Sequence, residues 1–161
     1  VPITRVSDGY PLLLRKKLGA EAPGCLWAKG DIALLERPAV ALVGSRALQP
    51  ENAAFARKVG QEAAKQGYVL VSGNAVGADR TAQDACLEAG GSVISVVADR
   101  LDEKKAQTNV LYISEDGYDQ GGNELFLRSE PSAAIGRSTA WHSGPLLPSA
   151  HWERAAPGTA R

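Results

Sequence analysis

The chain has 161 residues, long enough for one domain that buries its own hydrophobic core. It carries 18 basic and 18 acidic side chains, so no net positive field attracts nucleic acid and any such binding must come from a local patch. Cys25 and Cys86 match no zinc or disulfide spacing. We therefore expect two small buried hydrophobes in a reducing, cytoplasmic compartment. No apolar run reaches the length of a signal peptide or a membrane span, which predicts no membrane association.

The N-terminal segment, residues 1–37, contains three weak patterns. Residues 10–18 are predicted to be helical, and residues 25–28 and 32–35 are predicted to form short extended or helical pieces.

The core, residues 38–119, alternates apolar runs with helical patterns. In the first helical pattern Pro50 suits the first turn, Phe55, Val59 and Ala63 recur at fourfold spacing, and Gly67 stands where a helix-ending glycine belongs. The apolar runs predict strands at residues 39–43, 68–72, 92–97 and 109–114. Strands that alternate with helices predict an α/β, Rossmann-like fold of three layers with a mostly parallel sheet.

Two glycine-containing loops follow the first two core strands. The first has the sequence Val-Gly-Ser-Arg at positions 43–46, and the second has Ser-Gly-Asn-Ala-Val-Gly-Ala-Asp at positions 72–79. Such turns leave backbone N–H groups and the positive end of a helix available for phosphate. Because the carboxyl ends of parallel strands meet at one edge of a sheet, both loops are expected to form one phosphate-binding site.

The first loop offers three candidate ligands. Gly44 leaves room for a tight turn or an approaching phosphate. Ser45 can donate its hydroxyl to phosphate or can cap nearby backbone groups. The planar guanidinium of Arg46 suits bidentate phosphate binding, and its alternative role is a surface ion pair.

The second loop offers a further rim of donors at Ser72, Gly73 and Gly77. Asp79 is expected to be the N-cap of a helix that ends at Gly90. Its alternative role is to orient the arginine of the first loop or to bind a ribose hydroxyl.

Two amides belong to the second loop and the helix after it. Asn74 and Gln83 can read a ribose or a base edge by hydrogen bonding.

Weaker candidates lie beyond the two loops. Lys104 and Lys105 can contact a nucleic-acid backbone, although a solvated loop is the commoner explanation for such a pair. Glu115 and Asp116 are the only candidates for paired acid chemistry, which we do not expect. No catalytic residue, metal ligand or cofactor is predicted.

Residues 120–161 differ from the rest of the chain in composition. They contain no lysine, valine or tyrosine and are rich in glycine, proline, serine and alanine, which predicts a loosely ordered tail. Its aromatic and imidazole side chains could form a partner surface, but incidental aromatics in a tail are the favoured interpretation. The residues concerned are Trp141, His142, His151 and Trp152.

The joint spacing of several motifs resembles the DprA/Smf family of DNA-processing proteins. The motifs are Tyr10-Pro11 and residues 26–31, 40–46, 72–79 and 89–94. The resemblance implies a Rossmann-like domain, within the superfamily that contains the LOG phosphoribohydrolases. It also implies that this domain binds single-stranded DNA and delivers it to a recombinase, often as a homodimer. The chain departs from the family pattern at Gln83, where a histidine is usual, and beyond Asp119, where an Arg-Asn-Arg segment is expected.

Three functions follow from these observations. The leading one is a DNA-binding domain that holds the phosphates of single strands without chemistry. The alternative is a pocket for a nucleotide or nucleotide-derived ligand, since two helix ends and one arginine suffice for one small anion. A phosphoribohydrolase-type enzyme ranks last, because the Pro-Gly-Gly-x-Gly-Thr motif of that group is missing.

Overall fold

The computed structural model describes residues 1–98 and 100–115. The predicted boundary at residue 119 and the predicted tail lie outside these residues, as does Asp116. So does the partner surface considered at Trp141, His142, His151 and Trp152.

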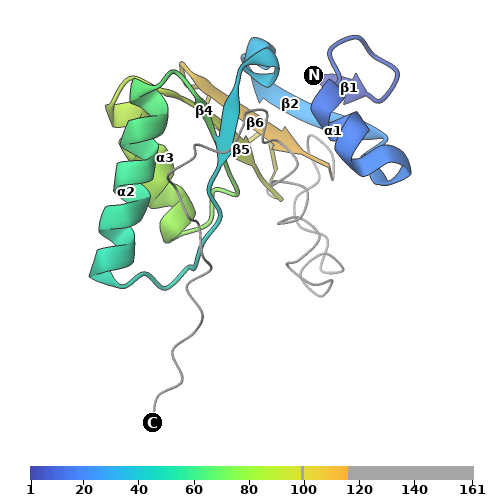
Figure 1. Cartoon of the computed structure of the whole chain (residues 1–161). Helices are drawn as coiled ribbons and strands as arrows, with labels where there is room; N and C mark the ends of the chain where they lie inside the picture. The colour runs from blue at the N-terminus through green and yellow to red at the C-terminus, as the bar shows by residue number, and fades with distance from the viewer. Residues whose placement is uncertain (99, 116–161) are drawn as a thin grey trace.

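The described residues form one mixed sheet of six strands in the order β1-β2-β6-β5-β4-β3 (Figure 1). The four strands from β3 to β6 run parallel, whereas β2 pairs antiparallel with both β6 and β1. The strands are β1 (Pro2–Thr4), β2 (Cys25–Gly30), β3 (Ala39–Ala41), β4 (Val69–Ser72), β5 (Ser92–Val96) and β6 (Val110–Ser114). The α/β, Rossmann-like fold with a mostly parallel sheet is therefore confirmed, and the four core strands lie within two residues of their predicted bounds.

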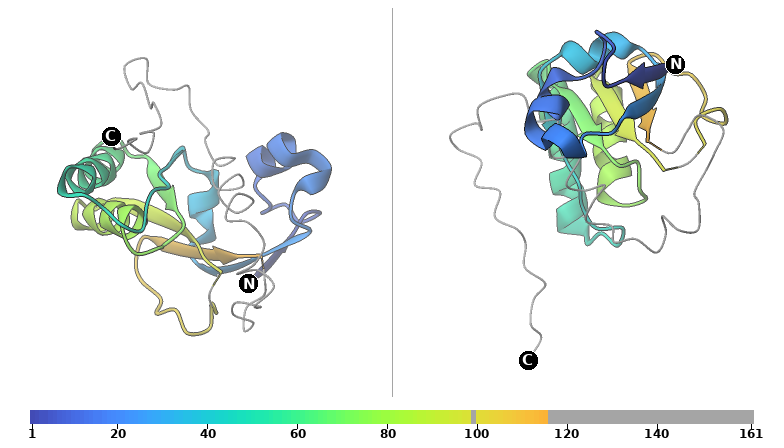
Figure 2. Two further views of the ribbon diagram at one scale, coloured as in Figure 1. Left: turned by 90° about the horizontal axis from the view of Figure 1, so that it is seen from below. Right: turned by 90° about the vertical axis from the view of Figure 1, so that its right-hand side faces the viewer.

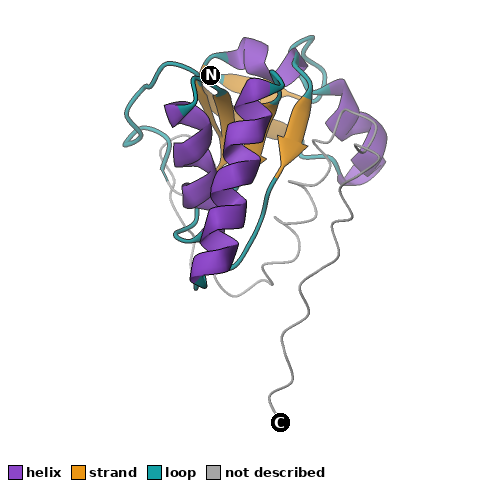
Figure 3. Ribbon diagram, turned by 60° about the vertical axis from the view of Figure 1, so that its left-hand side comes forward, coloured by secondary structure: helices purple, strands orange, loops and turns teal. Residues whose placement is uncertain are grey.

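Helices cover both faces of this sheet. The helices α2 (Pro50–Lys65) and α3 (Ala78–Glu88) lie side by side on one face (Figure 3). The helix α1 (Leu12–Leu18) and the 3₁₀ helices η1 (Gly19–Glu21) and η2 (Ile32–Glu36) belong to the other side, so that α1 lies well apart from α2 and α3 (Figure 2). In the described part of the chain no helix is both long and apolar enough to span a membrane.

The helix α2 begins and ends as the sequence predicts, and its buried residues are all small. Pro50 opens the helix, and Gly67 follows its C-cap with φ +73°. The buried residues are Ala56, Gly60 and Ala63, whereas Phe55 is 50% exposed. Of the residues with fourfold spacing, Ala63 is buried and Val59 packs against the core, whereas the contact with α3 is made by small residues and not by the Phe55 ring.

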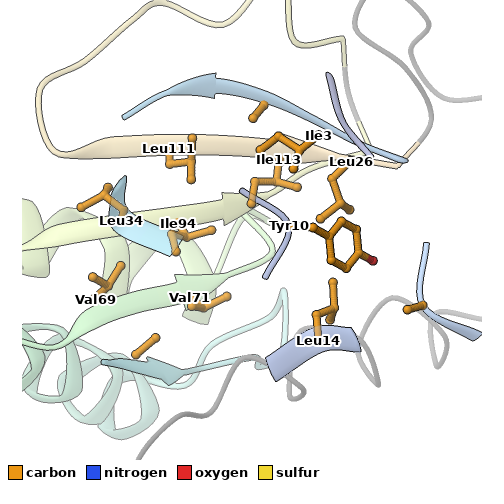
Figure 4. Packing of buried hydrophobic residues seen from close by; sticks show 13 residues of the cluster. Ile3, Tyr10, Leu14, Leu26, Leu34, Val69, Val71, Ile94, Leu111 and Ile113 are labelled. Atoms are coloured by element: carbon orange, nitrogen blue, oxygen red, sulfur yellow. The ribbon is translucent and has the colours of Figure 1, made fainter. Parts of the chain in front are cut away.

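The N-terminal segment is part of the sheet. Its strands β1 and β2 were not predicted as sheet members, yet β2 pairs with β6 along residues 27–30. The α-amino group of Val1 also donates to the Ala28 carbonyl at 2.6 Å. The large side chains of this segment pack against the sheet beside Leu26 and Ile113 (Figure 4).

The two cysteines are free, and they differ in environment. Cys86 is fully buried as expected, and burial raises the pKa of its thiol to about 11. Cys25 is only half-buried, so the expectation that both are core residues was wrong for this one. It lies on β2 near the edge of the sheet, where only one neighbouring strand, β1, covers it.

Candidate functional site

The two glycine loops meet at the carboxyl edge of the parallel strands, as predicted. The strands β3 and β4 are parallel neighbours, so their ends lie side by side. The Ala78 N–H donates to the Ser45 carbonyl at 3.1 Å, which joins the second loop to the first. Gly77 has φ +106°, and a Cβ there would lie 2.3 Å from the Ser45 carbonyl oxygen and 2.6 Å from that of Arg46. Only glycine permits this close approach of the two loops.

The carboxylate of Asp79 lies between the two loops. Its Oδ1 accepts the N–H of Gly44 at 3.0 Å, and its Oδ2 accepts the N–H of Gly73 at 3.1 Å. The side chain is 3% exposed. The predicted N-cap role was wrong, because α3 begins at Ala78 with Gly77 as its N-cap. Asp79 instead stands in the first turn, from which its side chain reaches back to the strand ends.

Burial and hydrogen bonding act on Asp79 in opposite directions. Burial raises the pKa of the carboxyl above its ordinary value, while the N–H groups of Gly44, Ala75 and Gly73 and the hydroxyl of Ser72 lower it. The Ser72 hydroxyl is fully buried, and it has no partner at hydrogen-bonding distance within the described residues. It nevertheless lies close enough to Asp79 to favour the charged form.

Several of the predicted phosphate donors are therefore engaged within the protein. The N–H groups of Gly44 and Gly73 donate to Asp79. The Ser45 hydroxyl donates to the Ala47 carbonyl at 2.9 Å and accepts the Ala47 N–H at 3.1 Å, which is the local cap that was its alternative role.

Arg46 remains available at the rim of the site. Its side chain is exposed, and within residues 1–98 and 100–115 it forms no hydrogen bond or ion pair. The backbone N–H groups of Ser45 and Arg46 have no partner in the same part of the chain. Across the rim, Asn74 is half-buried and adopts φ +61°, a left-handed conformation that asparagine tolerates better than most residues.

Gln83 lies in the interior below the second loop. It is 5% exposed, and its Nε2 donates to the Ser95 hydroxyl at 3.4 Å. Ser95 is fully buried and pairs in register with Ser72 on the adjacent strand. The sequence analysis missed Ser95, although its place near the end of an apolar strand resembles that of Ser72. A base-reading role for Gln83 would require this region to open.

The weaker candidates lie on other parts of the molecule. Lys104 is half-buried and Lys105 is exposed, and both lie in the loop before β6. This loop is joined to β2 by Lys29, whose ammonium donates to the Asp102 carbonyl at 2.8 Å. Glu115 is half-buried and lies near Tyr10, whose pKa its charge helps to raise. No three His, Cys, Asp or Glu side chains in the described residues gather closely enough to hold a metal ion.

This arrangement, a mostly parallel sheet with two glycine loops joined at its carboxyl edge, defines a Rossmann-like domain. Residues 2–119 match the family of DNA recombination-mediator protein A, and the chain belongs to that family.

Relatives from several bacteria share part of their length with this chain. The DNA processing protein DprA of Streptococcus pneumoniae is 43% identical over 97 residues, which are 60% of this chain and 33% of the relative. DprA of Bacillus subtilis is 32% identical over 99 residues, which are 61% of this chain and 32% of the relative. The match thus spans about a third of either relative.

Two solved structures are similar to the structure of this chain. The crystal structure of S. pneumoniae DprA superposes with a TM-score of 0.71 and 30% identity, over 88% of this chain and 51% of that chain. DNA processing protein A of Helicobacter pylori gives a TM-score of 0.63 at 23% identity, over 88% and 65% of the two chains. The second likeness supports the fold alone.

Proposed function

We propose that the carboxyl edge of the sheet holds the sugar-phosphate backbone of single-stranded DNA. The chain belongs to the family of DNA recombination-mediator protein A. The solved structure of the H. pylori protein describes how that protein binds single-stranded DNA. Arg46 is the principal phosphate ligand in this proposal, and the glycines Gly44, Gly73 and Gly77 give the two loops their shape.

The guanidinium of Arg46 carries this proposal, because it is exposed and has no partner within the described part of the chain. An arginine that is not engaged by a carboxylate keeps all its donors for a phosphate, which it can bind with two parallel hydrogen bonds. The free N–H groups of Ser45 and Arg46 lie on the same loop. Because the chain as a whole is neutral, we expect the affinity to be modest and to depend strongly on salt.

The alternative nucleotide pocket loses support at the same edge. A terminal phosphate would need several convergent backbone donors, yet the N–H groups of Gly44 and Gly73 already donate to Asp79. A diester that runs along the rim needs fewer donors for each phosphate. We therefore favour DNA over a mononucleotide.

The partners and compartment of this protein are further parts of the proposal. We propose, as the resemblance to the DprA/Smf family implies, that DNA held at this edge is passed to a recombinase and that the chain acts as a homodimer in the cytoplasm. The free, reduced state of Cys25 and Cys86 is in keeping with that compartment.

The test is a titration of the protein with oligothymidylates of increasing length at about 50 and 200 mM salt. Affinity should increase with length, and its logarithm should fall with log salt by roughly 0.7 for each phosphate contacted. Arg46→Ala should weaken binding by about 1 to 3 kcal/mol and reduce the salt slope.

The matched control is Arg57→Ala, which removes an exposed arginine from α2 that pairs with Glu88 away from the loops. It should bind DNA like the wild type. Affinity that saturates at a mononucleotide and is insensitive to salt would reject the proposal, and so would equal losses in the two variants.

A further inference from the structure

We infer that Asp79 is a resident anion that closes the space between the two glycine loops to phosphate, so that only a phosphodiester lying on the outer rim can bind. This inference deepens the proposed function, because it assigns Asp79 as the residue that selects a diester backbone over a terminal phosphate. Asp79 acts through the loops and would not itself touch the ligand.

The carboxylate occupies the place that an anion takes in other strand-to-helix sites. Such sites hold phosphate with backbone N–H groups at the strand end and the first turn of the helix. Here the two strand-end N–H groups, from Gly44 and Gly73, converge on the two oxygens of one side chain. Since each oxygen accepts a backbone proton, the geometry suits the ionised form.

There is little room left beside this carboxylate. A Cβ placed on Gly73 would lie 2.9 Å from Asp79 Oδ2, and one placed on Gly44 would lie 2.5 Å from the Ala78 side chain. Asp79 itself is 3% exposed. A phosphate carries the same sign of charge as Asp79 and would have to displace its carboxylate from both N–H groups, so charge repulsion excludes it.

The buried Ser72 hydroxyl is a second, independent observation. It is the one buried side-chain nitrogen or oxygen of the described residues that has no hydrogen-bond partner, and it lies near the Asp79 carboxyl. It stands beside the same carboxyl as the N–H groups of Gly44, Gly73 and Ala75. Removal of the carboxylate would leave the Gly44 and Gly73 N–H groups without their acceptor next to this hydroxyl, which is the composition of an anion site.

Titration of the wild type and of Asp79→Ala with inorganic phosphate and with formate tests this inference. Binding is followed by the backbone amide resonances of Gly44 and Gly73. In the wild type neither resonance should shift saturably up to about 50 mM anion, beyond the range of a specific millimolar site. In Asp79→Ala both should shift saturably, with an affinity at least tenfold higher than in the wild type, and formate should raise the melting temperature.

Asp84→Ala is the matched control, because it removes an exposed carboxylate from the same helix. It should behave like the wild type with both anions. Should Asp79→Ala fail to fold in buffer without anions, Asp79→Asn removes the charge with almost no change in shape. It should also gain phosphate affinity, but less than Asp79→Ala does, because the amide still fills the space of the carboxylate. Saturable phosphate shifts in the wild type, or none in either Asp79 variant, would overturn the inference.

Oligothymidylate separates this inference from the proposed function. Added to the wild type, it should shift the Arg46 resonances while the Gly44 and Gly73 amides keep their hydrogen bonds to Asp79. If DNA does not bind, the proposed function fails, whereas the phosphate and formate results still decide the role of Asp79.

Discussion

On one face of the sheet the two helices contribute mostly alanine, glycine and cysteine to the core, while on the other the N-terminal segment contributes tyrosine, leucine and isoleucine. The small residues let α2 and α3 approach each other closely. The large residues fill the space under a segment that has little regular structure. The α2–α3 face includes Ala56, Gly60, Ala63, Ala78, Ala82 and Cys86, and the opposite face includes Ile3, Tyr10, Leu14, Leu26 and Leu34.

The two faces also differ at the carboxyl edge, where the candidate site lies. A cluster of buried polar side chains lies below the α2–α3 face, at Ser72, Asp79, Gln83 and Ser95. On the opposite face the Tyr10 ring is the large buried group near that edge (Figure 4). The α2–α3 side of the sheet therefore holds the two glycine loops in place through Asp79, whereas the opposite side packs against the N-terminal segment.

Leu14→Ala should have the largest effect on stability. Leu14 is 2% exposed and is the only fully buried side chain of α1, so its truncation leaves a cavity below the N-terminal segment. We expect a loss of about 2 to 5 kcal/mol in the free energy of unfolding, measured by urea denaturation. Leu12→Ala removes a 60% exposed leucine from the same helix and should change stability by less than about 0.5 kcal/mol. Equal losses in the two variants would mean that α1 does not share the cooperative core.

Gly60→Ala should destabilise the opposite face, although alanine is the better helix former. A Cβ at Gly60 would lie 2.1 Å from the Ala82 carbonyl oxygen and 3.0 Å from the Cys86 nitrogen, both backbone atoms of α3. Separation of the two helices should cost about 1 to 3 kcal/mol, more than the gain of roughly 1 kcal/mol in helix propensity. Gly24→Ala, which meets no atom within 4 Å, is the control. A Gly60→Ala protein more stable than the wild type would contradict close packing of α2 on α3.

Tyr10→Phe should have a smaller effect, on the N-terminal side. The Tyr10 hydroxyl donates to the Pro23 carbonyl at 2.8 Å, and burial of the ring raises the pKa of the phenol. Loss of this one hydrogen bond should cost about 0.5 to 1.5 kcal/mol in thermal or urea unfolding. Tyr68→Phe is the matched control, since the half-buried Tyr68 hydroxyl has no partner in the described residues. A Tyr10→Phe protein as stable as this control would show that the hydrogen bond contributes nothing.

The sequence predicts the parallel half of the sheet well, because those strands are short continuous apolar runs bounded by glycine and proline. Pro50 and Gly67 likewise mark both ends of α2. It does not predict β1 or β2, since a three-residue strand and a mixed apolar and polar strand become recognisable only through their partners. The buried positions Ala56 and Gly60 of α2 could not be predicted, because alanine and glycine contribute little to a hydrophobic pattern. These two residues nevertheless lie on the side of α2 that contacts α3.

The sequence predicts where the candidate site lies, but not that the Asp79 carboxylate accepts the N–H groups of its two loops. Parallel topology alone brings the loops at Gly44 and Gly73 to one edge. The hydrogen bond from Gly44 to Asp79 joins residues 35 positions apart, and no local pattern distinguishes it from the N-cap that an aspartate before a helix usually provides. The engagement of the predicted phosphate donors by Asp79 is thus a tertiary property of the fold.

The pH dependence of stability should give the smallest effect, confined to the α2–α3 side. Burial is the largest cause that raises the pKa of Asp79 above 3.8, so the native state holds this proton more tightly than the unfolded state does. The stability that this group contributes is therefore fully present below about pH 3.8 and is lost as the pH rises through the raised native pKa. Asp79→Asn has no such titration. The difference in unfolding free energy between the wild type and this variant should shift in favour of the wild type as the pH falls from about 7 to 4.

Other carboxylates change stability over the same range, but they do not enter this difference. The pKa of Glu62 is lowered first by its hydrogen bond to Lys65, and that of Asp102 by its hydrogen bond to Arg100, so the stability from both is lost as the pH falls. Both groups are unchanged in Asp79→Asn and lie far along the chain from the substitution, so their contributions cancel when the two proteins are compared at each pH. A difference that stays constant from about pH 7 to 4 would mean that the Asp79 carboxyl titrates in the native protein as it does in the unfolded chain. If the wild type instead loses stability relative to Asp79→Asn as the pH falls, the native pKa of Asp79 must lie below its unfolded value. The N–H groups of Gly44 and Gly73 would then lower this pKa by more than burial raises it, and the space between the two loops would stabilise an anion despite being buried.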